Sequence, residues 1–211
     1  MVGLRERKKQ QTRQEIFEAS QHLFAKQGFE AVTVAAIARE ANVSEMTVFN
    51  YFPTKEDLFY AGMQFFEERL IEAVRHRPRG ESALRAFRRR VLEGAQNLVV
   101  SERADAIRRA GRIIASSPSL QAREQEIVDA YVRVLAEVLA EENRSGDGSG
   151  SVEARVVAAA MMAAHRTLVA YTRERVAAGG RGPSLAEDFR RQARRAFGRL
   201  ERGFGDYAVR S

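Results

Sequence analysis

The side chains best suited to recognition chemistry lie in residues 44–51, SEMTVFNY. Hydroxyl, amide and carboxylate groups recur in this stretch, and all of them form hydrogen bonds without further activation. Thr47 and Asn50 are three positions apart, so a helix presents both on one side. The residues expected to face outward from such a helix are Glu45, Met46, Thr47, Phe49 and Asn50. These groups favour the binding of a polar partner.

Two short helices joined by a tight turn are predicted to position these residues, within residues 33–55. Apolar residues recur at the i, i+3, i+4, i+7 spacing of one helix face, and they are Val34, Ile37, Ala38 and Ala41. Thr33 precedes them as an N-cap, and Ser44 is a second N-cap before the recognition stretch. Between the helices, Asn42 tolerates the left-handed backbone of a turn better than most residues do.

The second of these helices has an inward face as well as an outward one. Val48 and Phe52 are one turn apart and can pack against the first helix, while Val43 fills the turn. A helix that presents its N-terminal residues outward from a compact two-helix corner has the geometry of a DNA-reading helix-turn-helix. Double-stranded DNA is therefore the predicted polar partner.

The sequence contains few of the residues and motifs that catalysis or metal binding would need. The 211 residues include no Cys and three His, and no two imidazoles have metal-ligand spacing. A di-iron bundle needs Glu three positions before its histidines, where this chain has Ala19, Ala73 and Met162. There is no nucleophile elbow and no glycine-rich phosphate loop. We therefore expect neither an enzyme nor a cofactor or metal site.

Charge and hydropathy indicate an anionic partner and a cytoplasmic protein. The formal net charge is +7, but much of the excess lies in an arginine-rich stretch at residues 190–202, which is best interpreted as a solvated helix face. The charged start of the chain has no apolar segment behind it, so no signal peptide is predicted. The longest apolar run, residues 156–165, is too short to cross a bilayer, and no membrane partner is expected.

The whole chain is predicted to be helical. A basic, flexible arm over residues 1–12 is followed by a first helix to residue 27 and then by the helix-turn-helix. Thr54 and Asp57 resemble a capping box at the start of the next helix. Later helices are expected at residues 54–74, 84–98, 103–115, 120–142, 152–177 and 184–204, with a flexible loop at 143–151.

This pattern places the chain in the all-α class, with about nine helices and no credible strand pair. We predict an N-terminal three-helix DNA-binding domain over residues 1–53. A larger helical domain for ligand binding and dimerisation is predicted over residues 54–211.

The last two helices carry more apolar surface than one small helical domain can cover. Residues 156–164 are apolar all round, and an apolar stripe follows the final helix. A second copy packed through the same two helices around a two-fold axis would cover the excess. The residues expected at this homodimer interface are Val156, Ala160, Ala163, Phe189, Ala193, Phe197 and Leu200. The alternative is that both stripes belong to the core of one chain.

The helices between residues 54 and 177 supply aromatic and methionine side chains that can line an apolar pocket. The candidate ligand-binding residues are Phe66, Phe87, Tyr131, Met161, Met162 and His165. His165 would serve as a polar anchor, and the expected effector is a small hydrophobic or amphipathic molecule. Ordinary core packing is the alternative for each of these residues.

Residues 33–59, TVAAIAREANVSEMTVFNYFPTKEDLF, resemble the signature of TetR-type bacterial transcriptional regulators, and the preceding helix, RQEIFEASQHLFAKQGFEAVTV, fits as well. The resemblance covers about residues 12–60, and the remainder agrees only in length and helical character. It implies a homodimeric regulator, in the first place a repressor, that binds a palindromic operator. A small hydrophobic molecule that enters the C-terminal domain would release the DNA.

By position, the resemblance assigns DNA contacts to Thr33, Thr47, Asn50, Tyr51 and Lys55. Lys55 opens a helix, where its ammonium group and the helix N-terminus both attract a phosphate. With the outward residues and the second cap, the predicted DNA-binding set is Thr33, Ser44, Glu45, Met46, Thr47, Phe49, Asn50, Tyr51 and Lys55.

Three of these positions depart from the commonest pattern of the family. Phe49 stands where Tyr is frequent, which loses a phosphate hydrogen bond but keeps apolar contact with a thymine methyl group. Asn50 replaces an aromatic residue and can bond an adenine in bidentate fashion, whereas Glu45 is repelled by phosphates unless it accepts from a cytosine amino group. The operator, the effector, the regulated genes and the choice between repressor and activator stay open. The alternative function is a helical protein-interaction module that does not bind DNA.

Overall fold

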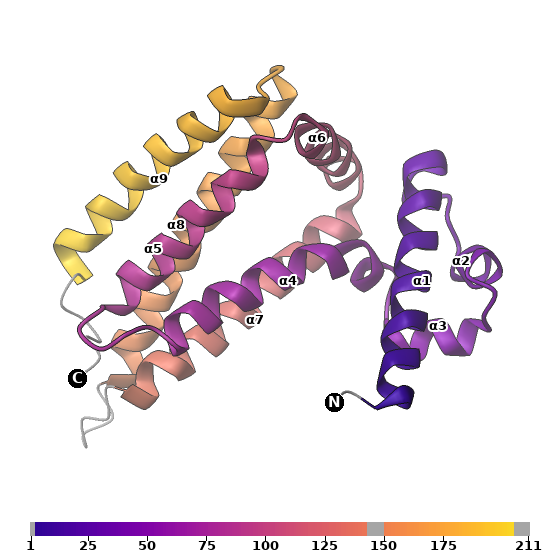
Figure 1. The fold of residues 1–211 in the computed structure, drawn as a ribbon, viewed down its shortest axis with the longest axis horizontal. Coiled ribbons are helices and arrows are strands. Elements are labelled where there is room, and N and C mark those ends of the chain that lie inside the picture. Colours follow the sequence, from indigo (N-terminus) through magenta and orange to yellow (C-terminus); the bar gives the residue numbers. More distant parts are fainter. Residues whose placement is uncertain (1–2, 143–149, 205–211) are drawn as a thin grey trace. The chain divides into compact units, whose positions relative to one another are not determined.

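The computed structural model describes residues 3–142 and 150–204, apart from the side chains of residues 4, 63–66, 142, 150 and 151. This part of the chain is helical and contains no strand, which confirms the predicted all-α class (Figure 1). The helices are α1 (Leu4–Gln27), α2 (Val34–Glu40), α3 (Glu45–Tyr51), α4 (Lys55–Arg75), α5 (Ala83–Gly94), the 3-10 turn η1 (Ala95–Leu98), α6 (Ser101–Ala115), α7 (Pro118–Glu142), α8 (Gly150–Ala177) and α9 (Gly182–Phe204). Among the described residues, no helix is long and apolar enough to span a membrane.

The chain folds into two compact units. The first contains the residues up to Phe65 together with Arg112–Glu124, and the second contains Phe66–Gly111 and the residues from Gln125 onward. Helices α4, α6 and α7 contribute residues to both units. The predicted domains, 1–53 and 54–211, divide the chain at a single point, and this division stays a prediction.

The first unit is built around three phenylalanine rings. The ring centroids of Phe24, Phe29 and Phe59 lie 5.2 to 5.9 Å apart, and all three side chains are buried. Ile37 of α2 and Val48 of α3 are fully buried in the same unit. The apolar faces of α1, α2 and α3 therefore form one core, and this core supports the recognition stretch.

Helix α1 is longer than the sequence pattern suggested. It begins at Leu4, so residues 4–12 are helical, which corrects the expectation of a flexible arm. Arg, Lys, Glu and Gln are good helix formers, and the side chain of Gln11 donates to Glu15 one turn later at 2.9 Å. Gly28 ends the helix with a φ of 80°, a conformation that glycine adopts easily.

The start of α4 is fixed by a capping box and by α7. The backbone N–H of Thr54 donates to Asp57 at 3.1 Å and that of Asp57 donates to the Thr54 hydroxyl at 3.0 Å, which confirms the predicted capping box. Asp57 Oδ1 also accepts from Nε and Nη2 of Arg123 at 3.0 and 2.7 Å. The Tyr60 hydroxyl donates to the carbonyl of Leu120 at 2.9 Å. The first turns of α7 thus brace α4.

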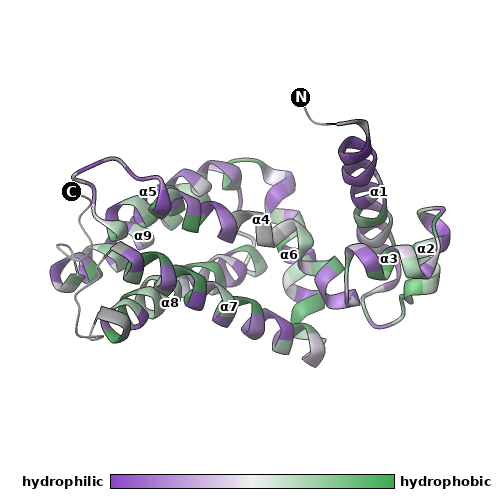
Figure 2. Ribbon diagram, turned by 90° about the horizontal axis from the view of Figure 1, so that it is seen from below, coloured by the Kyte–Doolittle hydropathy of each residue, from purple (hydrophilic) through white to green (hydrophobic). Residues whose placement is uncertain are grey.

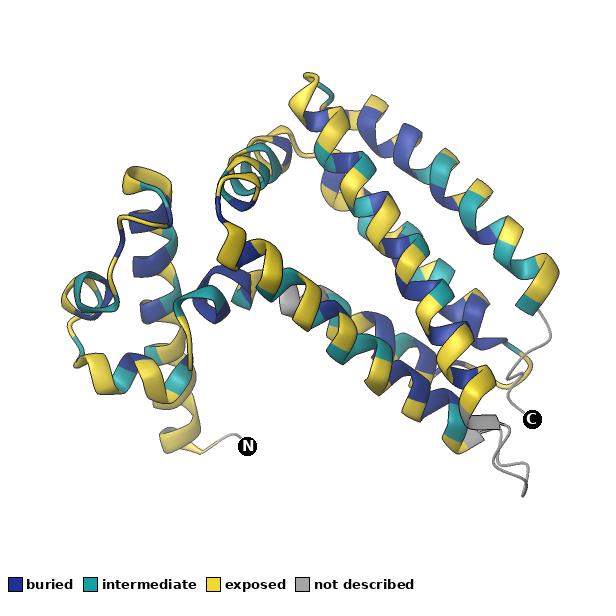
Figure 3. Cartoon of the chain, turned by 180° about the vertical axis from the view of Figure 1, so that it is seen from behind, coloured by how far each residue is buried: buried dark blue, intermediate teal, exposed yellow. Residues whose placement is uncertain are grey.

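The core of the second unit lies where α5, α8 and α9 meet (Figure 3). Phe87 and Phe197 are fully buried, with ring centroids 5.9 Å apart. At the edge of this core, Arg85 and Arg88 of α5 donate to the Glu201 carboxylate of α9 at 2.8 and 2.6 Å. Apolar packing and ion pairs therefore join α5 to α9.

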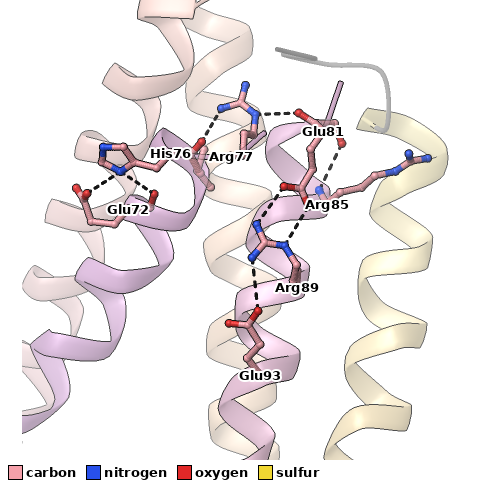
Figure 4. Close-up of polar contacts among 9 residues, drawn as sticks. Glu72, His76, Arg77, Glu81, Arg85, Arg89 and Glu93 are labelled. Atoms are coloured by element: carbon pink, nitrogen blue, oxygen red, sulfur yellow. Dashed lines mark hydrogen bonds and ion pairs between the residues drawn. The ribbon is translucent and has the colours of Figure 1, made fainter. Parts of the chain in front are cut away.

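The corner between α4 and α5 is closed by Arg77, whose side chain is almost fully buried. Its guanidinium donates to the carbonyls of Val74 and Glu81 at 2.6 and 3.0 Å (Figure 4). Arg89 donates twice to the Glu81 carboxylate, at 3.1 and 3.0 Å, and reaches Glu93 at 3.5 Å. The positive charge of Arg89 is thus balanced by the Glu81 and Glu93 carboxylates within this corner.

Two further predictions concern segments between helices. The helix expected at residues 84–98 ends at Gly94 and continues as the 3-10 turn η1, because glycine is a weak helix former. Of the flexible loop expected at residues 143–151, the first seven positions lie outside the described residues, and Gly150 begins α8.

Candidate DNA-binding interface

The corner between α2 and α3 is held by two side-chain caps and one left-handed residue. The hydroxyl of Thr33 accepts from the backbone N–H of Ala36 at 3.1 Å, and that of Ser44 accepts from the N–H of Thr47 at 3.1 Å. Asn42 between them has a φ of 53°, which few residue types other than glycine tolerate. Both predicted caps and the predicted turn residue are confirmed, and together they set the direction in which α3 leaves the corner.

The side chains of α3 divide into a buried and an exposed side. Val48 is fully buried, whereas Met46 is 69% exposed and Phe49 is 44% exposed. The hydroxyl oxygens of Ser44 and Thr47 lie 2.8 Å apart, and either one can donate to the other. The residues on the exposed side are Glu45, Met46, Phe49 and Asn50. The exposed side therefore offers an amide, a carboxylate and two apolar surfaces to a partner.

The three other positions assigned by the resemblance differ in their surroundings. Thr33 is exposed, and Tyr51 is half-buried in the last turn of α3. The ammonium group of Lys55, by contrast, donates to the carbonyls of Phe29 and Val32 at 2.9 and 3.1 Å and lies 4.2 Å from the centroid of the Phe29 ring. Because an ammonium group has only three donors, at most one is left for a phosphate. Lys55 thus holds the α1–α2 connection in place.

Four of the predicted ligand-binding residues lie in the core of the second unit. The buried ones, from α5 and α8, are Phe87, Met161, Met162 and His165. The ring of His165 stands edge-on to that of Phe87, with centroids 6.3 Å apart, and burial lowers the pKa of His165 to about 4. Tyr131 of α7 is half-buried against the same core, and Phe66 of α4 lies outside the described side chains.

The predicted dimer residues separate into two groups. Those on α9 that the chain's own core buries are Phe189 (8% exposed), Ala193 (0%) and Phe197 (0%). Leu200 also packs against this core. The first three side chains are buried by the chain's own core, which favours the alternative of core packing within one chain, and their place in a dimer interface stays a prediction. On α8, by contrast, Val156 is 52% exposed, Ala163 is exposed and Ala160 is half-buried.

One contact at α3 could not be predicted from the pattern of residues in the sequence. The guanidinium of Arg13 on α1 lies over the ring of Phe52, the C-cap residue of α3, at 5.2 Å from the ring centroid. A cation over an aromatic face is an attractive arrangement. Helical periodicity cannot indicate it, because periodicity relates neighbours on one helix and not residues on two helices.

Comparison with known proteins links both units to regulators. Residues 16–61 match the family described as Bacterial regulatory proteins, tetR family, and residues 81–204 match the MftR C-terminal domain. The HTH-type transcriptional regulator TcmR of Streptomyces glaucescens is 31% identical over 157 residues, which span 74% of this chain and 63% of TcmR. The fatty acid metabolism regulator protein of Bacillus subtilis is 26% identical over 149 residues, or 67% of this chain and 73% of that protein.

Among solved structures, the transcriptional regulator FadR of Bacillus subtilis in complex with stearoyl-CoA has a similar fold. The TM-score is 0.51 at 19% sequence identity, and the match covers 87% of this chain and 97% of that chain. At this level of identity the likeness concerns the fold.

Replacing Lys55 with Ala should destabilise the first unit, because it removes two charge-assisted hydrogen bonds to the α1–α2 connection. We expect the free energy of unfolding to fall by about 1 to 3 kcal/mol, measured by urea denaturation. Lys26→Ala, at an exposed lysine of α1, is the matched control and should change stability little. Unchanged stability together with lost DNA binding would instead make Lys55 a phosphate ligand.

Proposed function

Because the chain belongs to the TetR family of bacterial regulatory proteins, we propose that it is a ligand-responsive repressor that binds a palindromic operator as a homodimer. Family membership makes it a transcriptional regulator with a DNA-binding helix-turn-helix, and the family is one of regulators rather than enzymes. Beyond family membership, we propose that the protein represses transcription, forms a homodimer, binds an effector and is located in the cytoplasm. Residues 1–53 would bind DNA, and residues 54–211 would bind the effector and the second copy.

The observation that supports operator reading is the exposed side of α3 on a braced corner. The major groove admits an α-helix, and the N-terminal residues of a recognition helix reach the base edges. Asn50 is suited to a bidentate contact with adenine, and Met46 and Phe49 are suited to thymine methyl groups. Glu45 would accept from a cytosine amino group. Phosphate contacts are proposed for Thr33, Ser44, Thr47 and Tyr51.

The homodimer is supported by an apolar stripe on α8. Its exposed members are Val152 (63%), Val156 (52%), Ala159 and Ala163. Their spacing of four, three and four residues places them along one side of the helix. A second copy related by a two-fold axis would cover this stripe, and a palindromic operator requires the same symmetry. The proposed interface therefore rests on α8, without the buried stripe of α9.

The proposed effector is hydrophobic or amphipathic. Support comes from the aromatic and methionine side chains that gather in the second unit, since such side chains suit apolar ligands. The FadR protein of similar fold is described in complex with stearoyl-CoA, which has a long apolar chain. His165, neutral at pH 7 because burial lowers its pKa to about 4, would offer a ligand a hydrogen bond rather than a charge.

DNA reading is tested by selecting fragments of the source genome on the full-length protein. The selected fragment should be two-fold symmetric, and Asn50→Ala should lose about 1 to 3 kcal/mol of discrimination at one base pair of each half-site, measured by fluorescence anisotropy. Asn97→Ala, at an exposed asparagine of the second unit, is the matched control and should bind like the wild type. Binding to no duplex, or to all duplexes alike, would contradict the proposal and favour a protein-interaction module.

The dimer face is tested by placing a charge on α8. Val156→Arg should yield monomers in sedimentation velocity, because the interface would bury two unpaired guanidinium groups near its two-fold axis. Val100→Arg changes a valine of similar exposure, 54% against 52%, and should leave the dimer intact. A monomeric wild type, or a Val156→Arg dimer, would contradict this interface.

The effector class is tested by thermal shift with fatty acids and acyl-CoA thioesters on one side and sugars and divalent metal ions on the other. Apolar ligands at about a hundred times their Kd should stabilise the protein by about 2.7 kcal/mol and release the selected DNA fragment. Stabilisation by the sugars or metal ions alone would contradict a hydrophobic effector.

A further inference from the structure

The distribution of charge in the first unit is uneven along the chain. Residues 14–65, which contain α2 and α3, carry three cations against seven anions. Residues 4–13 carry five cations against one anion. Proteins bind the DNA backbone by neutralising phosphates with Lys and Arg. The helix-turn-helix itself is therefore too acidic to supply this attraction, and the first turns of α1 hold the compensating charge.

The few cations of residues 14–65 are not all available to DNA. Lys55 donates to the carbonyls of Phe29 and Val32, and Lys26 lies in the last turn of α1, so Arg39 is the cation left within the helix-turn-helix. Acidic groups collect on the other part of α1, where Glu15 and Glu18 line an open hollow together with His22 and Glu40. The positive charge available to an anionic partner is therefore concentrated in the N-terminal turns of α1.

Three of the N-terminal cations form a ridge on one side of α1. Arg5, Lys9 and Arg13 follow each other at intervals of four residues and are all exposed. Ile16 is eleven residues, or three helical turns, after Arg5, and its side chain is fully buried in the first unit. The cationic ridge (Arg5, Lys9 and Arg13) therefore continues the side of α1 that carries the buried Ile16. Figure 2 shows how hydrophilic these first turns are.

The ridge begins at the end of the recognition helix. The Arg13 guanidinium lies 5.2 Å from the ring centroid of Phe52, the C-cap residue of α3. From Arg13 to Arg5 the ridge extends for about 12 Å along α1, at 1.5 Å per residue. The ridge thus meets α3 at one end and extends toward the N-terminus of α1 at the other.

The ridge also lacks an acidic partner, unlike the arginines that are paired in the second unit. Within the described part of the chain, none of its three side chains forms an ion pair, and the nearby Glu15 carboxylate accepts from Gln11. In the second unit, by contrast, Arg89 is paired with Glu81 and Glu93 (Figure 4). Like charges at i, i+4 destabilise a helix, and a phosphate backbone would relieve that repulsion.

We propose that the cationic ridge binds the phosphates of double-stranded DNA just outside the base pairs that α3 reads. It supplies most of the electrostatic attraction of the first unit and lengthens the duplex needed for tight binding. This inference rests on the proposed DNA-binding function. It adds a contact surface that lies outside the helix-turn-helix.

The test compares two double variants of the full-length protein with equal loss of charge. Arg5→Gln/Lys9→Gln removes two members of the ridge. Arg7→Gln/Lys26→Gln removes one cation from the opposite side of α1 and one from its far end. Affinities are measured against salt concentration for the selected genomic fragment and for an unrelated duplex. All four side chains are exposed, so thermal unfolding should match the wild type.

The ridge variant should lower the slope of log affinity against log salt by about 0.9 per lost contact, or about 2 per protomer. At physiological salt its affinity for both duplexes should fall roughly tenfold to a hundredfold, with sequence preference retained. The control variant should keep a slope close to that of the wild type.

Three results would overturn the inference. The first is a ridge variant with the slope of the wild type, and the second is a control variant with an equal loss. The third is an unchanged DNA slope together with lost binding to phosphatidylglycerol vesicles, which would assign the ridge to membranes. Failure of the proposed function is a separate outcome, namely a wild type without sequence preference. In that case the salt dependence of binding to the unrelated duplex still tests whether the ridge binds phosphates.

Discussion

The recognition surface depends on one backbone constraint, the left-handed conformation of Asn42. A φ of 53° reverses the chain within a few residues, and the caps at Thr33 and Ser44 fix the two helix starts on either side. Because Val48 and Phe52 are buried, the opposite side of α3 faces solvent, with Glu45, Met46, Phe49 and Asn50 exposed. The turn and the core therefore determine which groups of α3 are exposed, and these are the groups proposed to read DNA.

Charge in this protein serves two separate purposes. Inside the first unit, Lys55 holds the α1–α2 connection, and the ion pair of Asp57 with Arg123 braces α4. On the surface of the same unit, the cationic ridge carries charge without an acidic partner in the described part of the chain. The net charge of +7 does not distinguish these purposes, because several arginines of the second unit face carboxylates, namely Arg85, Arg88, Arg89, Arg175 and Arg191. The proposed attraction for DNA therefore rests on where the charges lie and not on their sum.

Features that depend on neighbours within four residues could be predicted from the sequence, and these are Thr33, Asn42, Ser44 and the capping box of Thr54 and Asp57. Contacts across the fold could not. Lys55 stands at a helix start that suits a phosphate, but its acceptors come from a turn more than twenty positions earlier. Helical periodicity marks Phe197 and Val156 alike as apolar, yet one is buried and the other exposed. An amphipathic pattern identifies a face and leaves open what covers it.

The proposed function requires the exposed side of α3 to lie against DNA. A photo-crosslinking amino acid in place of Met46, which is 69% exposed, tests this most directly when the protein is bound to its selected fragment. We expect crosslinks to bases within both half-sites, and none from the same group in place of Val100 in the second unit. Crosslinks to protein alone, or equal crosslinking from both positions, would contradict it.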